Sequence, residues 1–126
     1  MSKLTLRLTE DVMAIHSLPA KSKIPEQVFN APIYFLANTP QEVSIVLPSN
    51  ITIESDDTED DWRMFEVVGP LAFSLTGILS NISTVLANEK ISIFAISTFD
   101  TDHILVKSNK IEHAKTALLA NGYDII

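Results

Sequence analysis

The chain has 126 residues, 46% hydrophobic and 20% charged, which is the composition of a folded globular protein. Its net charge of −7, with nine scattered lysines and arginines, argues against nucleic acid and anionic membranes as partners. The absence of cysteine excludes disulfides, thiol nucleophiles and cysteine-ligated metals. No apolar run approaches the roughly 18 residues of a membrane span, and no signal peptide is evident, so we expect a cytoplasmic protein.

The first half of the chain is predicted to consist mostly of antiparallel strands. Residues 3–8 alternate in polarity, as in a half-buried strand, and residues 12–18 are expected to form a hairpin with them. Residues 24–29 begin with a proline and a glutamate that suit a first helical turn. Two further strands are expected over 33–37 and 42–47.

The run from Asp56 to Asp61 is the most charged and least apolar segment of the chain. It lacks the glycine turn and the distal glutamate of a calcium loop, so we interpret it as a solvated linker without a metal. This linker divides the chain into predicted domains over residues 1–60 and 61–126.

The second half begins with a strand over residues 62–68. A helix is predicted from about residues 72–74 to residue 87 or 88, because apolar residues recur at the spacing of one buried helical face. These residues are Leu75, Ile78, Leu79, Ile82, Val85 and Leu86. Gly77 falls within the first turns of this helix, either to pack against the sheet or to admit a ligand.

A hairpin with an unusual turn follows. Strands are predicted over 91–96 and 103–106, and the turn between them, Ser97 to Asp102, contains carboxylates, hydroxyls and an aromatic ring. It lacks the Asn-Gly signal of a tight hairpin, so it is either a longer polar loop or a ligand-binding loop.

The last elements complete a recognisable order. Asn109 is expected to cap a second helix, Gly122 to end it, and residues 123–126 to form a strand. The second half therefore reads as β-α-β-β-α-β, the ferredoxin-like arrangement of an α+β fold. Residues 33–50 also resemble residues 93–109, either by chance or because the first half is a degenerate repeat.

Two stretches together resemble the ACT domain, and in particular the paired-ACT family of small bacterial proteins and eukaryotic cytosolic arginine sensors. They are G-P-L-A-F-S-L-T-G-I-L at 69–79 and I-S-I-F-A-I-S-T-F-D-T-D-H-I-L-V at 91–106. The resemblance covers residues 62–126 and implies an ACT domain over 61–126. It also implies a degenerate ACT-like domain over 1–60.

The resemblance further implies regulation by a free amino acid bound at a domain or subunit boundary, commonly in a homodimer, without a cofactor. The ligand-binding positions of the arginine-sensing relatives match Ala72, Phe73, Ser74, Thr98 and Asp102. Those relatives have a glycine at about position 72 and acidic residues where this chain has Ser74 and Leu75, which argues against arginine as the ligand.

The chemistry of the residues is consistent with that reading. A helix N-terminus near residues 72–74 attracts a carboxylate, and Asp102 and Asp100 can accept hydrogen bonds from an ammonium group. Each has an alternative role: the aspartates as solvated turn residues, Thr98 as a strand-end hydroxyl and Ser74 as a helix cap. Phe99 is either a pocket wall or an interface residue.

Catalysis is not predicted. His16, His103 and His113 show no metal-ligand spacing, and three glycines in the whole chain leave no phosphate-binding loop. We therefore expect a non-catalytic amino-acid sensor. The alternatives are an interaction module without a ligand, and a regulatory subunit of a partner enzyme such as an aspartate-kinase-like enzyme.

Overall fold

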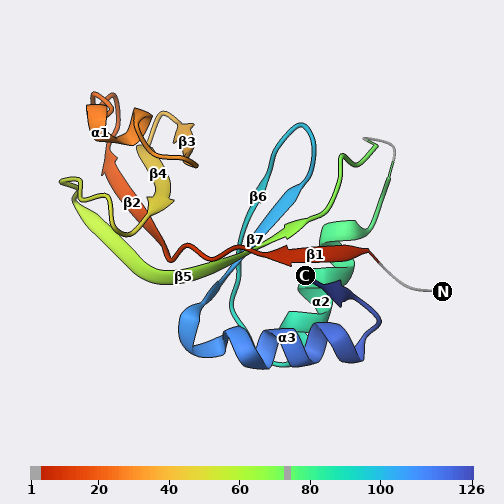
Figure 1. Ribbon diagram of the computed structural model, residues 1–126. Helices are drawn as coiled ribbons and strands as arrows, with labels where there is room; N and C mark the ends of the chain where they lie inside the picture. The colour runs from red at the N-terminus through yellow and green to blue at the C-terminus, as the bar shows by residue number, and fades with distance from the viewer. Residues whose placement is uncertain (1–3, 73–74) are drawn as a thin grey trace. The chain divides into compact units, whose positions relative to one another are not determined.

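The structure, a computed structural model, describes residues 4–72 and 75–126 and divides into two compact units (Figure 1). Unit 1 comprises Met1–Glu10 and Arg63–Ile126, and unit 2 comprises Asp11–Trp62. Residues 4–10, expected in the N-terminal domain, therefore belong with the C-terminal residues. The units differ in charge: unit 2 contains nine acidic and two basic residues, whereas unit 1 contains seven of each. The net charge of the chain thus comes from unit 2.

Unit 2 is an antiparallel sheet with one short helix. Strand β4 (Glu42–Pro48) pairs with β3 (Phe35–Asn38) on one side and with β2 (Met13–Pro19) on the other. Helix α1 (Glu26–Phe29) contributes Val28 to the core. The core residues are Leu18, Val28, Val43, Ile45, Leu47 and Ile53. The predicted strands and the short helix of this half are confirmed, including the β3–β4 hairpin.

The acidic run is not a linker. Residues 57–61 form the first part of β5 (Asp57–Val67), and this part pairs antiparallel with β2, for example Glu59 with Ile15. The run is exposed, as its charge predicts, but main-chain pairing does not depend on the side chains that point to solvent. The register shifts opposite Met13–Ile15, and Asp61 there has a φ of 71°, which marks a β-bulge.

Unit 1 confirms the predicted ferredoxin-like order. It runs β5, α2 (Ile78–Asn88), β6 (Phe94–Ser97), β7 (Asp102–Lys107), α3 (Ile111–Ala120) and β8 (Asp124–Ile125). Strand β7 pairs with both β5 and β6. The helices cover one face of the sheet, and their buried residues share a core with Phe65, Ile104 and other strand residues.

Strand β1 (Thr5–Leu8) lies between β5 and β8, antiparallel to the first and parallel to the second. The predicted hairpin of residues 3–8 with 12–18 is therefore wrong. Leu6 of β1 is fully buried among the core residues of unit 1 and pairs with Val67. The apolar face of this strand therefore packs against residues that are distant in the sequence.

Two predicted helix boundaries need correction. Helix α2 begins at Ile78 rather than at residues 72–74, and Asn109 lies in a 3₁₀ turn, η1 (Ser108–Lys110), that precedes α3. Lys110 occupies the N-cap of α3, without a side-chain cap hydrogen bond. Gly122 has a φ of 92°, which confirms the left-handed stop.

Candidate functional site

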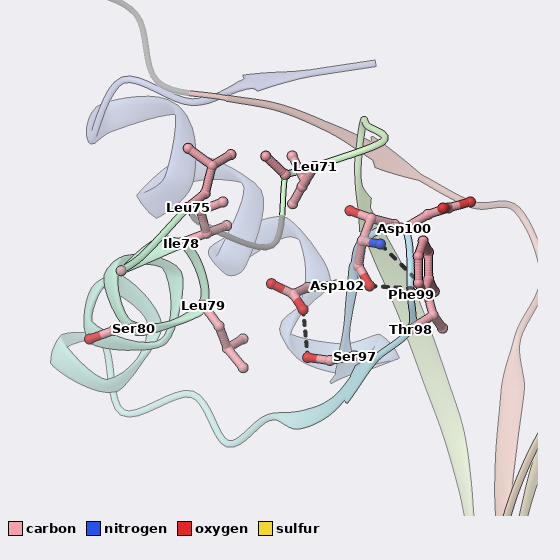
Figure 2. Close-up of a pocket in the computed structure, with 13 residues that line it drawn as sticks. Leu71, Leu75, Ile78, Leu79, Ser80, Ser97, Thr98, Phe99, Asp100 and Asp102 are labelled. Atoms are coloured by element: carbon pink, nitrogen blue, oxygen red, sulfur yellow. Dashed lines mark hydrogen bonds between the residues drawn. The ribbon is translucent and has the colours of Figure 1, made fainter.

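A pocket of about 300 Å³ opens in unit 1 between the start of α2 and the β6–β7 turn (Figure 2). The residues before and within α2 supply one side, and the turn supplies the other. The described lining residues are Leu71, Ala72, Leu75, Gly77, Ile78, Leu79, Ser80, Ser97, Thr98, Phe99, Asp100, Thr101 and Asp102.

The turn over residues 98–101 is held by hydroxyl groups rather than by an Asn-Gly pair. The Thr98 N–H donates to the Thr101 carbonyl at 2.8 Å, and the Thr98 hydroxyl donates to the same oxygen at 3.1 Å. The Thr101 hydroxyl donates to the carbonyl of Val67 at 2.6 Å, which ties the turn to the end of β5. The Leu71 N–H donates to the Asp100 carbonyl at 2.7 Å and fixes the loop after β5 against the same turn.

Replacing Thr101 with valine should lower the free energy of unfolding by about 1 kcal/mol, because the Val67 carbonyl loses a hydrogen bond in a partly buried place. Urea denaturation measures the change. Thr116→Val is the matched control, since its hydroxyl donates to a carbonyl on the exposed side of α3. Equal losses of unfolding free energy in the two variants would show that the hydrogen bond from Thr101 to Val67 does not stabilise the turn.

Asp102 is oriented by a residue that the sequence did not single out. The Ser97 hydroxyl donates to the Asp102 carboxylate at 2.5 Å, and the two residues are directly opposite in the β6–β7 ladder. Figure 2 shows this carboxylate between Ser97 and the side chains on the α2 side of the pocket. Among the described lining residues, the charged side chains are Asp100 and Asp102. The β6–β7 side of the pocket is therefore acidic and suits a cationic group such as an ammonium.

The start of α2 forms part of the opposite wall. Gly77 occupies the N-cap with a φ of 79°, so it is needed for a left-handed backbone rather than for packing against the sheet. No side chain caps this helix, and its first turn carries no acidic residue. Because the N–H groups of a first helical turn carry partial positive charge, this end of the pocket suits an anionic group.

The structure brings the predicted ligand-binding residues together as far as it describes them. Ala72, Thr98, Phe99, Asp100 and Asp102 all line the pocket, while Phe73 and Ser74 lie outside the described residues. Ala72 is not at a helix N-terminus, since α2 begins later, but its carbonyl accepts a hydrogen bond from the Leu75 N–H at 3.0 Å. The role of these residues in binding remains a prediction.

The sequence profile described as "ACT domain" matches residues 57–120. The chain belongs to the ACT domain family. This finding confirms the resemblance inferred from the sequence and the α+β fold of unit 1.

Curated relatives of this ACT-domain protein include cytosolic arginine sensors. The mouse protein named "Cytosolic arginine sensor for mTORC1 subunit 1" is 36% identical over 107 residues, covering 76% of this chain and 32% of the relative. The human protein of the same name is 42% identical over 65 residues, covering 51% of this chain and 20% of the relative. The chain thus spans about a third or less of the length of these relatives.

Solved structures share the fold of the ACT-domain protein. A protein from Agobacterium tumefaciens is 29% identical with a TM-score of 0.91, covering 100% of this chain and 94% of that one. The regulatory subunit of aspartate kinase from Thermus thermophilus has a TM-score of 0.64 at 14% identity, covering 94% of this chain and 98% of that one. The latter identity is low, so it shows the fold alone.

A second pocket, of about 270 Å³, lies on the other side of the same turn. Its lining includes Glu66, Asp100 and His103. His103 follows Asp102 in β7 and therefore faces the opposite side of the sheet. The ring is only 6% exposed, and this burial lowers the pKa of His103, while Glu66 and Asp102 act in the opposite direction.

His16 in unit 2 is a second buried imidazole. Its Nδ1 lies 2.8 Å from the Ser55 hydroxyl and 3.2 Å from the Thr58 hydroxyl. Burial lowers the pKa of His16, and the Asp60 carboxylate opposes the shift. His16 is therefore a buried side chain with two hydroxyl groups within hydrogen-bond distance.

The lowered pKa values of these two histidines predict acid destabilisation. An unfolded histidine titrates near pH 6.5, so below that pH the unfolded chain binds protons that the folded chain binds less readily. The stabilisation that comes from keeping these two histidines neutral is present in full above about pH 6.5. It is lost as the pH falls through their folded pKa values. Each histidine contributes a slope of at most about 1.4 kcal/mol per pH unit.

Urea denaturation between pH 8 and pH 5 measures this slope. His16→Gln and His103→Gln should each reduce it, and the double substitution should reduce it further. If the stability of the double variant depends on pH as steeply as that of the unmodified protein, the two histidines are not the cause of the acid destabilisation.

Two further findings concern the described part of the chain. No group of three or more histidine, aspartate or glutamate side chains there is placed to hold a metal ion. Among the described helices, none is long and apolar enough to cross a bilayer.

Proposed function

We propose that this ACT-domain protein binds a free α-amino acid in the pocket between α2 and the β6–β7 turn, and that binding regulates a partner. The observation that carries the proposal is the pairing of opposite electrostatic environments across one small pocket. The Asp102 carboxylate is held by Ser97 on one side, and the uncapped N-terminus of α2 borders the other.

These two groups match the two charges that every free amino acid presents. The ligand ammonium donates to Asp102 in a charge-assisted hydrogen bond. The ligand carboxylate accepts from main-chain N–H groups at the start of α2, where the helix dipole favours negative charge. Asp100 and Thr98 border the same site, and Ala72 and Phe99 complete its described edges.

The relatives support a regulatory rather than a catalytic role. A sequence relative that is 36% identical is named as an arginine sensor. This chain spans only part of the arginine sensors, so their ligand and partner are not transferred to it. We propose a non-catalytic, cytoplasmic module in which unit 1 contains the ACT domain and unit 2 belongs to a degenerate ACT-like domain.

Regulation would proceed by linkage. A ligand that binds one arrangement of the domains or subunits more tightly than another shifts the population toward it, and a partner reads the shift. We propose a homodimer as the functional form, with a partner enzyme or regulator as the receiver of the signal.

A thermal-shift screen of the purified full chain against the twenty amino acids tests the proposal. A ligand at about one hundred times its Kd stabilises the folded state by about 2.7 kcal/mol, which raises the melting temperature by several degrees. For each responding amino acid, the matched controls are the amine without the carboxylate and the hydroxy acid without the amino group. Both should give no shift, because each lacks one of the two charges.

The alternative is an interaction module that retains the fold without a ligand. It is favoured by two exposed apolar side chains at the pocket, Leu75 at 52% and Phe99 at 79% exposure. A flat screen, together with self-association or partner capture that is lost in Phe99→Ser, would support it. If the partner captured in this way is an enzyme, the chain would be a regulatory subunit of that enzyme.

A further inference from the structure

Four aliphatic side chains of the pocket are not used by the two contacts proposed for the amino and carboxylate groups. They are Leu71, Leu75, Ile78 and Leu79, here called the aliphatic wall. Figure 2 shows Leu75, Ile78 and Leu79 on the side of the pocket opposite the turn, around the space that Asp102 faces. Leu71 lies nearer the turn, where its N–H donates to the Asp100 carbonyl. Three of them pack against the core of unit 1 while remaining partly accessible, and Leu75 is 52% exposed. The wall therefore offers apolar surface to a bound ligand.

The charges of the pocket restrict the ligand side chain. Asp100 and Asp102 are the only ionisable side chains among the described lining residues, so a ligand with an acidic side chain would be repelled. A basic side chain would lose hydration against the aliphatic wall, which provides no hydrogen-bond acceptor from its side chains. Asp100 lies across the pocket on the exposed turn, where an ion pair contributes little.

We infer that the ligand is a neutral amino acid with an aliphatic side chain, of the size of valine, leucine or isoleucine. This inference rests on the amino-acid binding proposed above and adds the side-chain class. The ammonium and carboxylate groups fix the ligand between Asp102 and α2, and the side chain lies on the aliphatic wall. The volume of about 300 Å³ is at the lower end of that of small-molecule sites and suits a single amino acid.

The apolar contact should be visible as a difference between ligands that share the same charged groups. Leucine differs from alanine only in the hydrocarbon that would lie on the wall. Burial of three additional carbon atoms is expected to make leucine bind at least about tenfold more tightly than alanine. Arginine and glutamate should bind more weakly than alanine.

Isothermal titration calorimetry of the full chain with leucine, isoleucine, valine, alanine, arginine and glutamate tests this order. Leu75→Ser should reduce the leucine-to-alanine affinity ratio severalfold, because it removes exposed apolar surface of the wall and leaves the charged contacts intact. Leu119→Ser is the matched control: Leu119 is also 52% exposed, but it lies on α3 and does not line the pocket. The control should retain the ratio of the unmodified protein.

The possible outcomes distinguish a failure of the aliphatic side-chain class from a failure of amino-acid binding itself. The expected ligand order, with a reduced ratio in Leu75→Ser alone, supports the inference. Tighter binding of arginine or glutamate than of leucine, or an unchanged ratio in Leu75→Ser, overturns the aliphatic class and leaves amino-acid binding in place. No binding by any of the twenty amino acids overturns both.

Discussion

Replacing Asp102 with asparagine should weaken amino-acid binding by about tenfold to one-hundredfold, the largest effect on binding that we expect from one substitution. The ligand ammonium would lose a charge-assisted hydrogen bond, and hydrogen bonds to charged groups contribute about 1.5–3 kcal/mol. Asparagine keeps the size of the side chain and an oxygen that can accept from the Ser97 hydroxyl. The substitution therefore removes charge with little change in shape.

The control for this prediction is Asp124→Asn. Asp124 is an exposed carboxylate of unit 1 in β8 and does not line the pocket, so its neutralisation changes the net charge equally without changing the site. Calorimetric titration with the amino acid identified by the thermal-shift screen gives the affinities. Equal affinities of the Asp102→Asn and unmodified proteins would show that the ammonium is bound elsewhere.

Replacing Phe65 with alanine should lower the free energy of unfolding by about 3–5 kcal/mol, the largest stability effect that we expect. The ring is 0% exposed and belongs to the core that β1, β5, β7 and the two helices share. The substitution removes the buried ring and leaves a cavity that the surrounding strands cannot fill without moving. A loss of this size is a large fraction of the stability of a typical domain.

Phe99→Ala provides the comparison. Phe99 is 79% exposed at the β6–β7 turn, so the same change of residue should alter stability by less than about 0.5 kcal/mol. Urea denaturation at constant pH measures both variants. A cost below about 1 kcal/mol for Phe65→Ala would mean that the core closes around the missing ring.

The sequence predicted those features of the fold that depend on local periodicity. The apolar spacing of α2, the alternation within the strands and the glycine stop after α3 each report on neighbours within a few residues. Strand partners depend on residues far apart in the chain. The pattern of β1 therefore showed which face is buried, but it did not show that β5 and β8, rather than β2, lie beside it.

The errors have similar physical causes. Charge at Asp57–Asp61 correctly indicated exposure, but an exposed strand and a linker carry the same signal until the pairing with β2 is known. The start of α2 was predicted several residues too early because apolar spacing continues through Leu75, whereas the left-handed backbone of Gly77 sets the N-cap.

The candidate site could be predicted in part. Asp102 and Thr98 were found from the resemblance and from the chemistry of the turn. Ser97 was missed, although its position opposite Asp102 follows from the hairpin register once the turn is known to have four residues. The tie from Thr101 to Val67 could not be found, because it joins the turn to a strand more distant in sequence.

The insertion of β1 between β5 and β8 has a consequence for the order of folding. Unit 2 is one continuous segment, so the connections between its paired strands lie within residues 11–62. In unit 1, Leu8 pairs with Phe65 and Thr5 pairs with Asp124, so each contact closes a loop that contains all of unit 2. Loop closure costs more entropy as the loop lengthens, and non-local pairing slows folding. We therefore expect the amide protons of β2 and β4 to become protected from exchange during refolding before those of β1.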